Sequence, residues 1–194
     1  MTTNPAPRRR FTPSALRLAV LAVLGAAGLA AAYLWLGALG GDGDAPRRTA
    51  LASFTEKNVV VEIALERDGS GADAITARFT PTRAGFHLYG KDLPRGGLDG
   101  IGRPTLVEIV GPTPRRAGAM TADRPVETLN VPLLGVSFPV YPAGPVTLRQ
   151  PIALPAVAGD AELSVTYMAC SDRTCLAPAI DRRIPVRLPA AGDR

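Results

Sequence analysis

The chain has 194 residues, of which 46% are hydrophobic and 20% are charged, so it has room for one ordinary domain with a short extension. Its formal net charge is +5, but four of its 22 basic residues, Arg8, Arg9, Arg10 and Arg17, precede the first acidic residue. The chain from Asp42 onward therefore carries 18 basic and 17 acidic residues. A nearly neutral domain has no electrostatic attraction for phosphates, so we expect no nucleic-acid partner.

Residues 18–41 form an uncharged, mostly aliphatic segment. As a helix, the segment would span about 36 Å, which is enough for the ~30 Å hydrocarbon core of a bilayer. The arginines before it predict that residues 1–17 are a cytoplasmic basic tail and that the rest of the chain lies outside the cytoplasm. We therefore expect a single-pass cell-membrane protein with a periplasmic C-terminal domain. A cleaved signal peptide, with Ala38, Gly40 and Gly41 near the cleavage site, stays open as the alternative.

The pattern after the apolar segment is typical of β-structure. Residues 42–48 are polar and contain Gly and Pro, so residues 42–54 are predicted to be a linker, residues 55–189 to be the domain, and residues 190–194 to be a tail. Alternating apolar and polar residues predict a hairpin from strands at 59–66 and 74–80. Further strand candidates, separated by turns rich in Pro and Gly, are 86–89, 105–110, 136–141, 146–154, 162–168 and 184–188. This pattern predicts an all-β, antiparallel sandwich of immunoglobulin-like topology, preceded by the single N-terminal transmembrane helix.

The chain contains two cysteines, Cys170 and Cys175, with four residues between them. Outside the cytoplasm a disulfide is the default state of such a pair. A structural staple and a redox-active pair both fit this spacing. Closing a six-residue ring stabilises a fold by roughly 2 kcal/mol, against about 4.7 kcal/mol for a hundred-residue loop, so the pair is poorly placed for stability. Arg173, between the cysteines, would favour a thiolate, and Asp172 would oppose it.

Three segments of the chain together form a recognisable sequence pattern. The first is the cysteine segment, residues 165–178, whose sequence is VTYMACSDRTCLAP. The second contains Phe86-His87-Leu88-Tyr89, Leu93-Pro94, Gly97, Gly102 and Pro104-Thr105, and the third contains Val140-Tyr141 and Gly144-Pro145-Val146-Thr147-Leu148. Together these segments resemble the N-terminal periplasmic domain of the DsbD family of thiol:disulfide interchange proteins, and the resemblance covers about residues 55–188. Two positions depart from the family pattern: Met168 stands in place of Gln, and Ala179 in place of the second Pro.

The resemblance implies an immunoglobulin-like domain in which the two cysteines form a catalytic dithiol/disulfide, as in an oxidoreductase component of thiol:disulfide interchange and cytochrome c biogenesis. Cys170 would be the attacking thiolate, Cys175 its partner, and Tyr167 would lie beside the pair with Arg173 in support. Electrons would come from a thioredoxin-like or membrane electron-donor protein and pass to exported disulfide-containing proteins. Phe138 or Tyr141 would take the place of the aromatic residue that shields the disulfide in better-known members.

Two other functions stay open at the level of the sequence. One is a non-catalytic, immunoglobulin-like protein-binding module in which the disulfide is structural. The other is a Cu(I) carrier, because thiolate and thioether ligands suit this ion and the candidates Met168, Met120 and the two cysteines are present. A closed zinc site would lack a ligand, and His87, the single histidine, is more often structural on a strand. We expect no resident metal and no cofactor.

Overall fold

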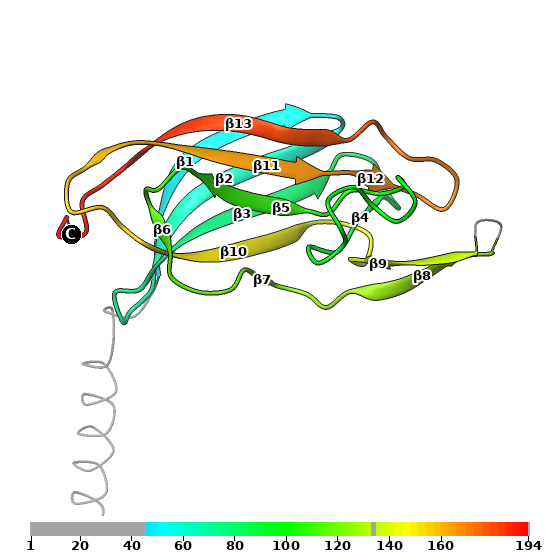
Figure 1. Ribbon diagram of the computed structural model, residues 1–194, viewed down its shortest axis with the longest axis horizontal. Coiled ribbons are helices and arrows are strands. Elements are labelled where there is room, and N and C mark those ends of the chain that lie inside the picture. The colour runs from blue at the N-terminus through cyan, green and yellow to red at the C-terminus, as the bar shows by residue number, and fades with distance from the viewer. Residues whose placement is uncertain (1–45, 133–134, 194) are drawn as a thin grey trace, which may run out of the picture. The chain divides into compact units, whose positions relative to one another are not determined.

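The computed structural model describes residues 46–132 and 135–193 (Figure 1). The predicted cytoplasmic tail at 1–17 and the predicted transmembrane helix at 18–41 lie outside the described residues. Over the described ranges, no helix combines the length and the apolar character needed to cross a membrane. The described part is built from antiparallel strands, which confirms the prediction of an all-β, antiparallel fold.

The larger sheet has six strands. Its main path is β1 (Arg47–Glu56), β2 (Val59–Arg67), β3 (Asp73–Pro81), β10 (Val146–Ala153) and β6 (Arg115–Arg116), and β7 (Thr121–Ala122) also pairs with β10. The β2–β3 hairpin follows the alternation in the sequence, because every second residue of β2 from Val59 to Leu65 is buried. Its turn is held by Asp68, whose carboxylate accepts hydrogen bonds from Ser70 and from the backbone N–H of Ala72. These hydrogen bonds, first that of the Ser70 hydroxyl, lower the pKa of Asp68.

The second layer is a three-stranded sheet in the order β13 (Ala179–Leu188), β11 (Gly159–Tyr167) and β5 (Leu106–Val110). Leu163 in the central strand faces Ile184 on one side and Ile109 on the other. Side chains on the inner face of this sheet, such as Val165 and Ile184, join one buried cluster with Phe79 and Leu148 of the larger sheet. The two sheets therefore form a sandwich around a shared core, as the sequence pattern predicts.

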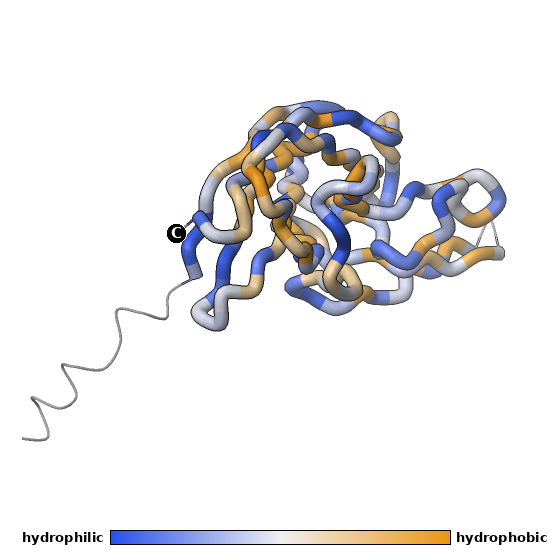
Figure 2. Tube along the Cα trace, turned by 60° about the vertical axis from the view of Figure 1, so that its left-hand side comes forward, coloured by the Kyte–Doolittle hydropathy of each residue, from blue (hydrophilic) through white to orange (hydrophobic). Residues whose placement is uncertain are grey.

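Tyr167 closes this core near the end of β11. Its ring packs edge-on against Phe79 with the ring centroids 5.5 Å apart, and its hydroxyl donates a hydrogen bond to the Glu56 carbonyl over 3.0 Å. Burial raises the pKa of Tyr167, so the hydroxyl stays protonated as a donor. Figure 2 shows hydrophobic residues along the strands and polar ones in many of the connecting loops.

Four short strands lie outside the two main sheets, at the end of the domain away from the C-terminus (Figure 1). They form two pairs, β4 (His87–Leu88) with β12 (Ala169–Cys170) and β8 (Glu127–Val131) with β9 (Val136–Val140). A bridge between Tyr89 and Val140 links the two pairs, and the Tyr141 N–H donates to the Leu88 carbonyl over 2.8 Å. This linkage brings the β8–β9 hairpin against the segment that contains the first cysteine.

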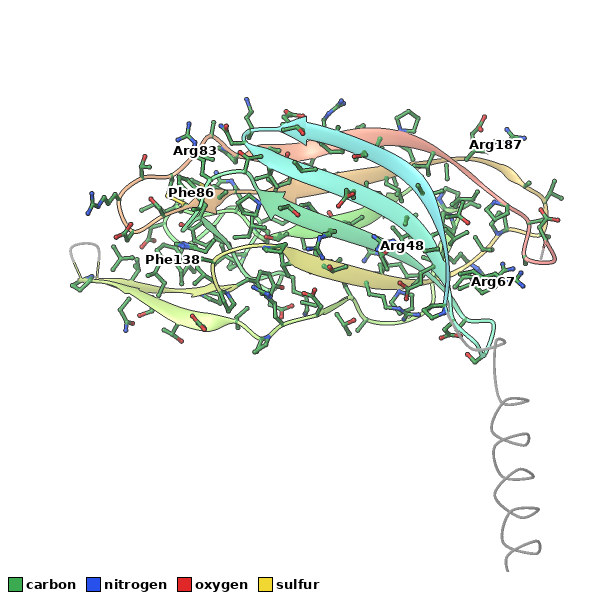
Figure 3. All side chains as sticks on the ribbon, turned by 180° about the vertical axis from the view of Figure 1, so that it is seen from behind. Arg48, Arg67, Arg83, Phe86, Phe138 and Arg187 are labelled. Carbon is green, nitrogen blue, oxygen red and sulfur yellow. A yellow bond between two sulfur atoms is a disulfide. The ribbon has the colours of Figure 1, made fainter. Side chains whose placement is uncertain are left out.

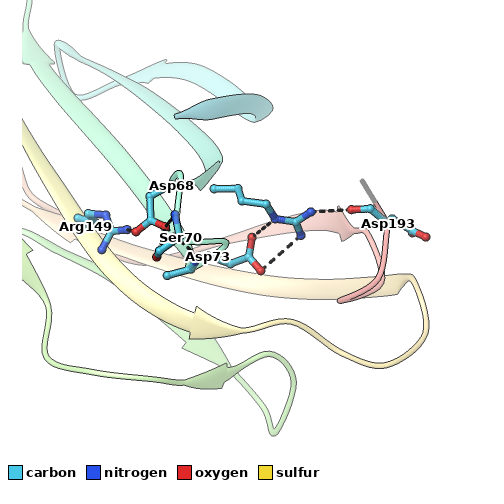
Figure 4. Close-up of polar contacts among 7 residues, drawn as sticks. Asp68, Ser70, Asp73, Arg149 and Asp193 are labelled. Carbon is cyan, nitrogen blue, oxygen red and sulfur yellow. Dashed lines mark hydrogen bonds and ion pairs between the residues drawn. The ribbon is translucent and has the colours of Figure 1, made fainter. Parts of the chain in front are cut away.

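Ion pairs and a hydrogen bond to the backbone connect segments at the opposite end of the domain. Arg67 donates to the Asp73 carboxylate over 2.8 Å and to the Asp193 carbonyl over 2.6 Å, so the C-terminal segment is tied to the β2–β3 hairpin (Figure 4). Arg149 lies 3.7 Å from the carboxylate of Asp68 in the turn of the same hairpin. Figure 3 places Arg67 and Phe138 at opposite ends of the sandwich. Phe138 belongs to the same buried cluster as Cys170, so Arg67 is remote from the first cysteine.

Several boundaries differ from the prediction. The linker predicted at 42–54 is wrong from Arg47 onward, because these residues form edge strand β1, with Thr49 opposite Leu65 of β2. Strand β13 begins at Ala179, before the predicted start at residue 184. The short strands β6, β7, β8 and β12 are not separate elements in the sequence prediction. All of these segments except β12 are largely solvent-exposed, so the alternating apolar pattern is weak or absent there.

Candidate redox site

Cys170 and Cys175 form a disulfide across a tight hairpin, as the sequence predicts. The Ser171 N–H donates to the Thr174 carbonyl over 2.8 Å, and the Leu176 N–H donates to the Ala169 carbonyl over 2.9 Å. The cysteines thus occupy the non-hydrogen-bonded pair between these two links, the position at which antiparallel strands come closest. Their Cα atoms lie 4.0 Å apart.

The two faces of β12 point into different environments. Ala169 pairs with Leu88 of β4, and both belong to the main core, which is the buried cluster that the two sheets share. Cys170 pairs with His87, and its side chain joins a second buried cluster. Because side chains alternate along a strand, Met168 shares the face of Cys170, and it packs against the same second cluster.

We call this second cluster the cysteine cluster. Its buried members are Tyr89, Leu93, Phe138, Val140 and Cys170, and its partly buried members are Leu98, Ile101, Leu129, Val131, Val136 and Met168. The Tyr89 hydroxyl lies 3.4 Å from the Cys170 sulfur, within hydrogen-bond range for a sulfur atom. The rings of Tyr89 and Phe138 pack edge-on with their centroids 5.4 Å apart. The β8–β9 hairpin therefore supplies an apolar wall, including Phe138, beside the first cysteine.

The two sulfur-bearing residues differ in their access to solvent. Cys170 is 1% exposed, whereas Cys175 lies on the exposed limb of the hairpin, beyond the exposed tip residues Asp172 and Arg173. Burial raises the pKa of Tyr89, so its hydroxyl remains a neutral donor beside Cys170. A thiolate formed on Cys170 would be buried next to a hydroxyl donor, and a thiolate on Cys175 would face solvent.

The structure brings some of the predicted site residues together and separates others. Cys170, Cys175 and Phe138 share the site, and Arg173 stands at the exposed tip of the hairpin. The Tyr167 side chain instead lies in the main core and binds the Glu56 carbonyl, so it does not line the cysteine cluster. Tyr141 also lies in the main core, where its hydroxyl accepts a hydrogen bond from the backbone N–H of Lys91.

The two methionines considered as Cu(I) ligands pack against different buried clusters. Met168 packs in the cysteine cluster, whereas Met120 packs against the main core. Within residues 46–132 and 135–193, no three or more His, Cys, Asp or Glu side chains gather in a way that could hold a metal ion.

Tyr89 and His87 are the site residues that the sequence interpretation does not assign. Both lie in the segment that carries part of the family resemblance. His87 belongs to β4 and Tyr89 to the bridge that directly follows it, so in this extended segment their side chains share one face. Their rings pack edge-on with the centroids 6.2 Å apart. The period-two spacing was available in the sequence, but the pairing of this segment with the cysteine strand was not.

A glycine makes room for Tyr89. Gly102 has a φ of 78°, and a Cβ built there would lie 2.9 Å from Cε1 of Tyr89. We expect Gly102→Ala to lower the free energy of unfolding by about 1–3 kcal/mol for the backbone strain, and by more because the Tyr89 ring must move. Gly100→Ala is the matched control, because Gly100 has a φ of 83° but no atom within 4 Å of the added Cβ. Urea unfolding of both variants measures the difference, and equal losses would show that contact with Tyr89 does not matter.

Comparisons with known proteins give a weak structural likeness. No protein-family model matches the chain, and no curated protein sequence matches it. The solved structure of the N-terminal periplasmic domain of ScsB from Proteus mirabilis is similar, with a TM-score of 0.46 and 13% sequence identity, over 76% of this chain and 55% of that one. The chain thus spans only about half the length of the structure that it matches.

Proposed function

We propose that this chain is a membrane-anchored, extracytoplasmic thiol–disulfide exchange module, with an immunoglobulin-like domain of the DsbD N-terminal type. The observation that carries the proposal is the asymmetry of the disulfide. Cys175 is exposed, whereas Cys170 is buried against the Tyr89 hydroxyl. Thiol–disulfide exchange needs one sulfur that an incoming thiolate can reach and one that can leave as a stabilised thiolate. A disulfide that only closes a hairpin needs neither feature.

The exchange step follows from this geometry. A thiolate of a reduced, thioredoxin-like or membrane electron-donor protein attacks the Cys175 sulfur, and the new sulfur–sulfur bond forms as the Cys170–Cys175 bond breaks. The electron pair of the broken bond goes to Cys170, which leaves as a thiolate. The second thiol of the donor then attacks the donor's first sulfur, which is bonded to Cys175 in the mixed disulfide. The donor disulfide forms and Cys175 is released. The donor loses two electrons and the cysteine pair gains them.

Transfer to an oxidised exported protein runs the same steps in reverse. Cys175, which is exposed, loses its thiol proton to solvent and attacks the substrate disulfide as a thiolate, and Cys170 then resolves the mixed disulfide. This order exchanges the roles expected from the sequence, in which Cys170 is the attacking thiolate. The physical reason is access, because Cys170 is 1% exposed and an in-line approach to a substrate sulfur requires exposure.

The reduction potential of the Cys170–Cys175 couple tests the proposal. Exchange proteins have potentials between about −120 and −270 mV, and structural disulfides of exported proteins lie below about −300 mV. We expect a value between about −180 and −270 mV, measured on the full chain by equilibration with glutathione or dithiothreitol buffers and alkylation of free thiols. A potential below about −300 mV would instead favour the protein-binding module with a structural disulfide. The double variant Cys170→Ala/Cys175→Ala controls for alkylation of other groups.

A further inference from the structure

His87 is a buried polar residue for which the sandwich itself has no evident use. Its side chain is 8% exposed, and in the described part of the chain its Nε2 atom has no hydrogen-bond partner. Buried polar atoms are nearly always paired, so an unpaired one calls for an explanation such as a role in catalysis. The position of the residue, next to the disulfide, suggests what that role is.

The strand register places His87 directly opposite Cys170. Side chains of residues that face each other in an antiparallel pair lie on the same side of the sheet, with Cβ atoms about 4.5–5.5 Å apart. Tyr89, two residues further along, lies on this same side, and its hydroxyl reaches the Cys170 sulfur. Leu88, between them, points to the main core, as alternation requires. The imidazole and the buried sulfur are therefore neighbours across the β4–β12 ladder.

We propose that His87 is the proton acceptor that serves Cys170, so that the reduced protein holds a Cys170 thiolate beside a His87 imidazolium. This proposal rests on the proposed exchange function, since it concerns the sulfur that leaves when the disulfide opens. The orphan Nε2 atom of the oxidised protein gains its partner in the reduced state.

The energetics of the leaving sulfur require such a partner. When the disulfide opens, a full negative charge forms on Cys170 inside a cluster of apolar side chains, where an unpaired charge is strongly unfavourable. Oxidation of the donor dithiol releases two protons as it supplies two electrons. One of these protons goes to Cys175 and the other to His87. A positive imidazolium next to a thiolate stabilises it, as in enzymes with paired Cys and His residues.

Burial and the neighbouring charged groups determine the protonation state of His87 in the oxidised protein. Burial lowers the pKa of His87, and the Asp172 carboxylate at the hairpin tip acts in the opposite direction. Tyr89 is the other titratable group on this face, and it is neutral because burial raises its pKa. The imidazole is therefore neutral at pH 7 while the disulfide is closed. A thiolate on Cys170 would raise the pKa of His87, because an opposite charge favours the protonated form.

The chain itself offers a clean measurement, because His87 is its only histidine. NMR of the full chain in detergent, with isotope-labelled histidine, reports the protonation of this one imidazole. We expect its pKa to be higher by about one unit or more in the protein reduced with excess phosphine than in the oxidised protein, a tenfold change in proton affinity. In Cys170→Ala the same reductant should leave the imidazole pKa unchanged. An equal pKa in both redox states of the native chain would overturn the proposal.

A second measurement follows the sulfur. The absorbance of the thiolate near 240 nm titrates Cys170 in the reduced Cys175→Ala variant, and adding His87→Gln should raise the pKa of Cys170 by about one unit or more. An unchanged thiol titration would contradict the pairing. Both measurements use a chemical reductant and no protein partner. They can therefore succeed even if the couple proves too reducing for exchange, and they can fail in a protein that exchanges disulfides well.

Discussion

The reduced Cys170→Ala variant is expected to accumulate a mixed disulfide with an oxidised exported protein, at least tenfold more than the Cys175→Ala variant does. In Cys170→Ala the exposed Cys175 remains to attack the substrate disulfide, and no second thiol is left to resolve the product. In Cys175→Ala the remaining sulfur belongs to a residue that is 1% exposed and enclosed by the cysteine cluster. Non-reducing electrophoresis with mass spectrometry of the adduct measures both the amount and the cysteine involved.

The comparison separates three outcomes. Trapping through Cys175 alone supports the order of attack proposed from exposure. Equal or stronger trapping through Cys170 would restore the role that the sequence resemblance assigned to it, and it would mean that the cluster opens when the disulfide is absent. If neither variant trapped the exported protein, the proposed exchange function would be contradicted. The double variant Cys170→Ala/Cys175→Ala, which carries no thiol, sets the background.

The strands that could be predicted from the sequence are those with one buried face. β2 and β3 alternate because each packs one side on the core, and the turn between them contains the Asp68 and Gly71 that it requires. β1 could not be found in this way. Its first four residues, from Arg47 to Ala50, are exposed on an edge strand, and their conformation is set by backbone pairing to β2. The pairing partner, and not the local pattern, decides the structure there.

The part of the candidate site that is formed by residues close together in the sequence could be predicted. The cysteine hairpin needs only six consecutive residues, and both its pairing and its disulfide follow from the spacing and from the compartment expected from the sequence. Tyr167 is three residues before Cys170. Because side chains alternate along a strand, this odd separation places the two side chains on opposite faces. The spacing therefore did not support placing the Tyr167 side chain beside the cysteines. Tyr89 reaches Cys170 across 81 residues of sequence, and only the fold establishes that contact.

Variants of Tyr89 and Tyr167 test which of the two tyrosines supports Cys170. We expect Tyr89→Phe to raise the pKa of the Cys170 thiol by about one to two units, because a hydrogen bond to a charged group contributes about 1.5–3 kcal/mol and one pKa unit corresponds to about 1.4 kcal/mol. The donor would be lost from a thiolate that is otherwise surrounded by apolar side chains. Thiolate absorbance of the reduced protein and the rate of reduction by a thioredoxin-like donor both report this change.

Tyr167→Phe is the matched control, since it removes a hydroxyl of the same kind from the main core. It should lower the free energy of unfolding by about 0.5–1.5 kcal/mol through loss of the hydrogen bond to the Glu56 carbonyl, and it should leave the thiol titration unchanged. If Tyr167→Phe instead shifted the thiol pKa as much as Tyr89→Phe does, the supporting role predicted for Tyr167 from the sequence would stand. We expect only Tyr89→Phe to shift the thiol pKa, because the two tyrosines lie in different buried clusters. The Tyr167 hydroxyl donates to the Glu56 carbonyl of β1, whereas the Tyr89 hydroxyl lies beside the Cys170 sulfur.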